Sequence, residues 1–111
     1  MARITYNKLV RDRIPEIIRA DNAEPFTRVL SEEEFTQALK DKLVEEAKEL
    51  AAATSRDDIV NELSDVWQLV ESIVSDFGIT LEEVETAKED KKTKRGSFEQ
   101  RLFLEYVDKA A

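Results

Sequence analysis

The sequence predicts an all-α protein, folded as an antiparallel helical bundle. Three segments open with a helix-capping pattern, and only two glycines and two prolines interrupt the chain. Two of these segments carry apolar residues at intervals of three and four, the spacing that gives an α-helix one apolar face. Long helices that each bury one face pack side by side, so a bundle with short connections is expected.

The first expected element is a short helix over residues 15–21 (PEIIRAD). Pro15 suits a first helical position, where its missing N–H leaves no hydrogen bond unmade, and Ile14 before it is biased away from helix. Asn22 and Pro25 close this helix. Residues 26–30 (FTRVL) alternate weakly between apolar and polar, so they are expected to form a short extended segment.

The first long helix is expected to run from Ser31 to about Ala53. Ser31 and Glu34 form a capping box, in which each side chain accepts a hydrogen bond from the backbone of the other residue. Leu30 and Phe35 have the spacing of a hydrophobic staple, which packs one residue before the cap against one inside the helix. These two signals define the start of this helix.

A second long helix is expected over about residues 57–77. Ser55 with Asp58 resembles another cap. Gly78 ends the helix, because glycine tolerates the positive φ that commonly follows a helix.

A third helix is expected to open at Thr80, which forms a capping box with Glu83. It should continue to about Lys92 or Lys94. With the two long helices before it, this gives the three capped helices from which the bundle is predicted.

The tail, residues 97–107 (SFEQRLFLEYV), is compatible with two conformations. It could continue as helix, or residues 102–107 could run extended beside residues 26–30, because the apolar side chains do not separate onto one face. No repeat, linker or low-complexity tract divides the chain, and its length suits one domain over residues 1–111.

Composition excludes several kinds of chemistry. The chain has no cysteine and no histidine, which excludes a disulfide framework, a thiol nucleophile and a Ser-His triad. A formal net charge of −8 argues against a protein that coats a nucleic-acid polymer, since phosphate backbones are bound by basic faces. Reaction chemistry is therefore expected to use carboxylates, lysine, arginine, hydroxyls and metal-bound water.

The chain shows no signal for a membrane or for export. The first residues lack the apolar core of a signal peptide, and no apolar run approaches the roughly 20 residues that cross a bilayer. We therefore expect a cytoplasmic protein without a membrane partner.

Two acidic motifs carry most of the functional information: Glu46 with Glu49 in VEEAKEL, and Glu62 with Asp65 in IVNELSDVW. Residues three apart project from one side of a helix. Two such helices side by side would crowd four carboxylates into one small volume. Because like charges repel, this arrangement is tolerated mainly when a hard divalent cation neutralises it.

Either motif alone is more typical of a solvated helix surface than of a metal site, because acidic pairs three residues apart are common in so acidic a chain. The position of the motifs relative to the apolar stripes favours the metal site. Both acidic pairs flank the apolar stripe of their helix and so border the seam between two packed helices. On the first helix the stripe comprises Phe35, Leu39, Leu43, Ala47 and Leu50, and on the second Ile59, Leu63, Val66, Val70, Ile73 and Phe77. A metal site at this seam is therefore the leading hypothesis. Glu45 lies further round the first helix, so it is expected to face solvent or to contact the metal ligands rather than the metal.

Two basic groups stand out in this acidic chain. One ends at a glycine and comprises Lys88, Lys91, Lys92, Lys94 and Arg95, and the other is the N-terminal NKLVRDR, which contains Lys8 and Arg11. The first group suits a phosphate-binding edge, but cations at a helix C-terminus equally complement the helix dipole. The second suits either a ligand contact or a polar arm docked on the bundle.

These motifs together resemble a known family. YNKLVRDRIPEII, EEAKE, NELSD and KKTKRGSFEQRL are similar to segments of the MazG-like, phosphoribosyl-ATP pyrophosphohydrolase-like group of all-α nucleoside triphosphate pyrophosphatases. The group's pattern, EExxE followed by ExxD, is filled here by Glu45, Glu46, Glu49, Glu62 and Asp65. The NKLVRDxIPE opening marks a small single-domain branch. That branch often carries Gly-Gly-Phe after the basic run, where this chain has Gly96-Ser97-Phe98.

The resemblance implies hydrolysis of a nucleoside triphosphate between its α and β phosphates, giving a monophosphate and pyrophosphate. It implies Mg²⁺, with Mn²⁺ as an alternative, held by Glu46, Glu49, Glu62 and Asp65. Glu45 or Glu49 would accept the proton of the attacking water. Contacts to the substrate phosphates are implied for Lys88, Lys91, Lys94, Arg95, Lys8 and Arg11.

The implied partners are the nucleotide and further copies of the chain, as a dimer or tetramer, since the site in this group commonly lies near a subunit boundary. Nucleotide-pool housecleaning is the implied role. The same scaffold could hydrolyse phosphoribosyl-ATP. A rival from another class is a non-catalytic acidic helical module that binds a basic partner. A ferritin-like di-iron protein is disfavoured, because its ExxH ligands require histidine.

Overall fold

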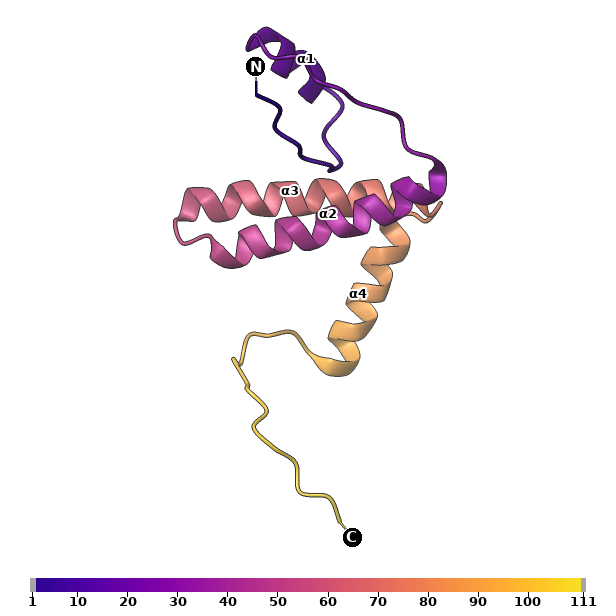
Figure 1. The fold of residues 1–111 in the computed structure, drawn as a ribbon. Helices are drawn as coiled ribbons and strands as arrows, with labels where there is room; N and C mark the ends of the chain where they lie inside the picture. The colour runs from indigo at the N-terminus through magenta and orange to yellow at the C-terminus, as the bar shows by residue number, and fades with distance from the viewer. Residues whose placement is uncertain (1, 111) are drawn as a thin grey trace. The chain divides into compact units, whose positions relative to one another are not determined.

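The computed structural model describes residues 2–110, and the regular structure in that range is entirely helical (Figure 1). The all-α prediction is confirmed. Among these residues, no helix combines the length and the apolar character that crossing a bilayer requires. The elements are α1 (Ile14–Ala20), α2 (Glu32–Ala52), α3 (Arg56–Asp76) and α4 (Leu81–Arg95).

Both predicted capping boxes are formed. The Ser31 hydroxyl accepts a hydrogen bond from the Glu34 backbone N–H at 3.2 Å, and the Glu34 carboxylate accepts one from the Ser31 N–H at 3.2 Å. Thr80 and Glu83 repeat the arrangement at 3.1 and 2.7 Å. Arg28 also donates to Glu34 at 2.9 Å, and this hydrogen bond, followed by those from Ser31, lowers the pKa of Glu34 to about 2. The caps therefore fix the starts of α2 and α4 as predicted.

Replacement of Ser31 by alanine is expected to lower the free energy of unfolding by about 1 kcal/mol, because the Glu34 N–H then loses its acceptor. Urea unfolding at neutral pH measures this. Ser31→Asp keeps a side-chain acceptor at the cap and should unfold within a few tenths of a kcal/mol of the natural protein. An alanine variant as stable as the natural protein would contradict the assigned cap.

Both ends of the second long helix are formed by the residues that predict them. The Ser55 hydroxyl accepts from the Asp58 N–H at 3.1 Å, and α3 then continues to Asp76. Gly78 has φ +66°, in the left-handed region that glycine occupies without strain.

Several helix boundaries differ from the prediction by one residue. α1 begins at Ile14, one residue early, with Pro15 accommodated in the first turn. α4 continues to Arg95, one residue beyond the predicted limit. Neither residues 26–30 nor residues 102–107 belong to a helix or a strand, so the helical alternative for the tail is wrong.

The described residues form two compact units, one up to Gly78 and the other from Ile79. In the first unit, α2 and α3 pack lengthwise against each other as an antiparallel hairpin (Figure 1). The second unit contains α4 and the tail. A single domain over residues 1–111 stays a prediction.

The hairpin seam is only partly apolar. Leu39 on α2 and Val74 on α3 are 2% and 7% exposed, and Glu46 is buried with them at 7%. The predicted stripe is not covered throughout, because Leu63 and Phe77 are about half exposed in this single chain. The seam therefore encloses the carboxylate of Glu46 in a small core, and it leaves part of the apolar stripe exposed to solvent.

Candidate metal centre

The two acidic motifs meet across the α2–α3 seam, as their spacing predicts. Glu46, Glu62 and Asp65 each place one carboxylate oxygen within 4.8 Å of the others, and Glu45, Glu46 and Glu49 do the same. Glu46 belongs to both groups. The helical repeat supplies this geometry, because residues i and i+3 share a side of each helix and the seam brings the two sides together.

Glu46 lies at the centre of this cluster and away from water. Glu46 Oε2 and Glu62 Oε2 are buried, and neither has a hydrogen-bond partner within the part of the chain that the structure describes. Burial, followed by the adjacent carboxylates of Glu49, Glu62 and Asp65, raises the pKa of Glu46 to about 7. The cluster therefore lacks a compensating positive charge at its inner oxygens.

The N-terminal segment supplies positive charge at the outer side of the cluster. Arg11 Nη2 lies 2.7 Å from Asp65 Oδ1, and Lys8 Nζ lies 3.6 Å from Glu45 Oε1. These are two of the cations in the predicted NKLVRDR group. The docked-arm interpretation of that segment is therefore realised in this structure, and the cations it brings stand beside the acidic motifs.

Lys42 is a member of this site that the sequence analysis missed. Its side chain is only 19% exposed, and its Nζ lies 3.4 Å from Glu45 and 3.6 Å from Glu46. The spacing held a signal, since Lys42 precedes these residues by three and four positions and so shares their side of α2. Positive charge thus reaches the cluster from α2 itself.

The residues present fit a divalent cation. All donors are carboxylate oxygens, which hard ions such as Mg²⁺ and Mn²⁺ prefer. The cations already in place pair with Glu45, Asp65 and one oxygen of Glu46, and they leave the buried Oε2 atoms of Glu46 and Glu62 unpartnered. A cation among the carboxylates would satisfy both atoms and remove the repulsion that raises the pKa of Glu46.

The predicted basic edge lies in the second unit. Lys88 pairs within α4, 2.9 Å from Glu85 and 3.8 Å from Glu89, and the hydrogen bond to Glu85 is the main cause of its raised pKa. Lys91, Lys94 and Arg95 lie on the last turns of α4, where cations also complement the helix dipole. Their contact with a phosphate stays a prediction.

Comparison with known proteins identifies the family. A family model described as phosphoribosyl-ATP pyrophosphohydrolase matches residues 6–92. An uncharacterised protein of Mycolicibacterium smegmatis is 56% identical over 50 residues, which are 45% of this chain and 51% of that protein. The match thus spans about half the length of this relative. No solved structure matches the chain.

The family match extends over both acidic motifs, the N-terminal basic segment and most of α4. Members of this family are nucleotide pyrophosphohydrolases that depend on divalent metal ions, in agreement with the carboxylate cluster at the seam. The chain therefore belongs to the phosphoribosyl-ATP pyrophosphohydrolase family, within the MazG-like all-α superfamily.

Proposed function

We propose that the protein is a Mg²⁺-dependent nucleoside triphosphate pyrophosphatase that cleaves between the α and β phosphates. The observation that carries the proposal is the buried Glu46, shared by two groups of carboxylates and unpartnered at one oxygen. Charge of this kind inside a seam is costly for stability, so its presence indicates a function that uses it.

Glu46, Glu49, Glu62 and Asp65 would hold the metal, with Mg²⁺ favoured and Mn²⁺ as the alternative. When bound, the metal supplies positive charge that offsets the charge of the triphosphate oxygens as the α–β bond breaks. The remaining steps belong to residues of the chain.

The attacking water must lose a proton as its oxygen bonds to the α-phosphorus and pyrophosphate leaves. Glu45 and Glu49 are the candidates to accept that proton. Glu45 forms ion pairs with Lys8 and Lys42, whereas the side chain of Glu49 is exposed to solvent. This difference favours Glu49 as the proton acceptor and Glu45 as the residue that holds the two lysines beside the cluster.

Arg11 and Lys8 lie beside the carboxylates that would hold the metal, Arg11 at Asp65 and Lys8 at Glu45. If Asp65 serves as a metal ligand, the Arg11 guanidinium would be free to bind a phosphate of the substrate. Lys88, Lys91, Lys94 and Arg95 are the further candidates to contact the leaving pyrophosphate.

A homo-oligomer is part of this proposal. Val60, Leu63 and Trp67 follow the i, i+3, i+7 spacing of one helical strip on α3, and they are 53%, 49% and 61% exposed. This strip is separate from the one that carries Glu62 and Asp65. Large apolar residues exposed along one strip of a helix are typical of a surface that a second subunit covers.

Trp67→Lys is expected to convert the oligomer to a smaller species, because a lysine in the centre of an apolar interface is strongly unfavourable. Light scattering coupled to size-exclusion chromatography at several concentrations measures the mass. Gln37→Lys, on an exposed part of α2, is the control and should leave the mass unchanged. A Trp67→Lys variant of unchanged mass would remove this strip from the interface.

Phosphoribosyl-ATP is the second candidate substrate, because the description of the matching family names it. It has the same triphosphate to cleave, so the metal cluster suits it equally. Noncanonical or excess nucleotides are the candidates if the role is housecleaning.

A panel of common and damaged nucleoside triphosphates together with phosphoribosyl-ATP tests the proposal. Pyrophosphate release is measured with Mg²⁺, with Mn²⁺ and with EDTA. We expect metal-dependent release of pyrophosphate and the monophosphate, and the preferred nucleotide identifies the role. A complete lack of turnover across the panel would favour the non-catalytic acidic module instead.

A further inference from the structure

Lys42 is the cation that lies deepest in the carboxylate cluster. Its Nζ is 3.6 Å from Glu46 Oε1 and 3.4 Å from Glu45 Oε2, and its side chain is only 19% exposed. Within the described residues, Lys42 is the one cation that forms an ion pair with Glu46. The proposed reaction leaves the charge of Lys42 without a role.

The two cations of the N-terminal segment stand in a different relation to the cluster. Lys8 and Arg11 pair with Glu45 and Asp65 at its outer side, and both side chains are more than twice as exposed as that of Lys42. Ion pairs between exposed groups contribute little, because water and salt screen them. Lys42 instead shares α2 with its partners, one turn away. Its charge is therefore present at the cluster independently of the N-terminal segment.

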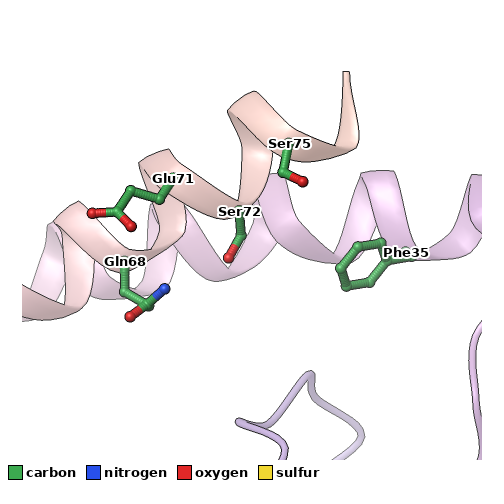
Figure 2. Close-up of a pocket in the computed structure, with 5 residues that line it drawn as sticks. All are labelled: Phe35, Gln68, Glu71, Ser72 and Ser75. Carbon is green, nitrogen blue, oxygen red and sulfur yellow. The ribbon is translucent and has the colours of Figure 1, made fainter. Parts of the chain in front are cut away.

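A lone carboxylate of the same hairpin has no such lysine. Glu71 of α3 is partly buried on an open surface with Gln68, Ser72 and Phe35 (Figure 2). It belongs to neither group of clustered carboxylates, and the ion pairs among the described residues do not include it. Partial burial alone thus does not bring a lysine to a carboxylate here. The partly buried lysine is found where like charges are crowded.

A lysine in this position has two opposite effects. In the metal-free protein its positive charge offsets part of the repulsion among the carboxylates, which stabilises the folded state. The offset is partial, since burial and the neighbouring carboxylates still raise the pKa of Glu46 to about 7. The same positive charge repels any divalent cation at the cluster. Removal of the charge should therefore destabilise the metal-free protein and strengthen metal binding.

We propose that Lys42 is a built-in counter-ion of the cluster, which stabilises the metal-free protein and lowers its affinity for metal. The contacts agree with this role. Lys42 approaches Oε1 of Glu46, whereas Oε2 of Glu46 is the buried oxygen without a partner, so the lysine leaves open the oxygen that a metal would use. The proposal rests on the metal centre of the proposed function and not on turnover. It adds a residue that sets how much metal the protein needs.

The test uses two substitutions of Lys42. Lys42→Met removes the charge and keeps a flexible apolar side chain, whereas Lys42→Arg keeps the charge. Calorimetry measures binding of Mg²⁺ and Mn²⁺, and the melting temperature in EDTA reports the stability of the metal-free protein. We expect Lys42→Met to melt about 5 °C lower in EDTA. We also expect it to bind Mg²⁺ about 5-fold more tightly. Lys42→Arg should resemble the natural protein in both measurements.

Lys48→Met is the matched control, since it removes the same charge from an exposed position of the same helix. It should change neither the melting temperature in EDTA nor the affinity for Mg²⁺. A double-mutant cycle in EDTA isolates the ion pair without any metal. Lys42→Met should lower the melting temperature less in the Glu46→Gln protein than in the natural protein, because the partner charge is already absent.

The opposite directions of the two changes distinguish a counter-ion from a structural residue. A lysine that only holds Glu46 in place would weaken metal binding when removed, and a lysine that only packs against α2 would leave binding unchanged. Either result overturns the proposal, as does an unchanged melting temperature of Lys42→Met in EDTA. These results would leave the proposed function intact if the natural protein binds Mg²⁺. A natural protein that binds neither Mg²⁺ nor Mn²⁺ would overturn the metal centre of the proposed function as well.

Discussion

Glu62→Gln and Asp65→Asn are each expected to reduce metal-dependent kcat/KM for pyrophosphate release by about 100-fold or more, equivalent to about 2.7 kcal/mol of transition-state stabilisation. Each amide preserves the size of the side chain but removes one negative charge from the group formed with Glu46. Because Mg²⁺ depends on charged oxygen ligands, the loss should appear first as weaker metal binding. Activity as a function of Mg²⁺ concentration measures it.

The matched control is Asp57→Asn, an exposed carboxylate in the first turn of the same helix. This variant should retain turnover and the response to Mg²⁺. Melting curves with and without Mg²⁺ exclude misfolding as the cause, since the ligand variants should lose the metal-induced rise in melting temperature without melting earlier in EDTA. Full turnover in Glu62→Gln and Asp65→Asn would show that these residues are not the metal ligands.

Glu46→Gln is expected to stabilise the metal-free protein at neutral pH while it abolishes metal binding. The folded-state pKa of Glu46 is raised from 4.5 to about 7 by burial and by the neighbouring carboxylates. Between these two values the folded state binds more protons than the unfolded state, so stability falls as pH rises. The stability that protonated Glu46 contributes to the folded state is fully present below about pH 4.5. It is lost by the time pH has risen through about 7. A neutral glutamine removes this loss, which is on the order of 3 kcal/mol for a shift from 4.5 to about 7.

Urea unfolding in EDTA at several pH values between 5 and 8 measures this effect. The natural protein should lose stability relative to Glu46→Gln across that range, and Mg²⁺ should restore the natural protein alone. A metal at 100 times its Kd stabilises by about 2.7 kcal/mol, so the restoration is large enough to resolve. Parallel stability profiles for the two proteins in EDTA would contradict the raised pKa.

Much of the fold followed from local sequence. The caps at Ser31, Ser55 and Thr80 are formed by the residues that predict them, because a cap is made by side chains within one turn. The carboxylate cluster was also predictable, since the i, i+3 spacing of each pair and an antiparallel hairpin are enough to bring the two pairs together.

Other features were beyond local sequence. The short extended segments expected at residues 26–30 and 102–107 are not strands, because a strand is defined by a partner and not by its own pattern. Trp67 is 61% exposed in this chain, although a side chain of this size on a long helix is commonly buried, and its place in an interface stays a prediction.

The sequence by itself determined the helices, their caps and the sides of α2 and α3 on which the carboxylates lie. These depend on interactions within a few residues, which the helical repeat fixes. Only the tertiary structure decided that Glu46 is the buried member, that Arg11 reaches Asp65 across 54 positions of sequence, and that Lys42 faces the cluster. The physical reason is that burial and long-range ion pairs depend on which surfaces meet, and many arrangements of surfaces are compatible with one pattern of helices.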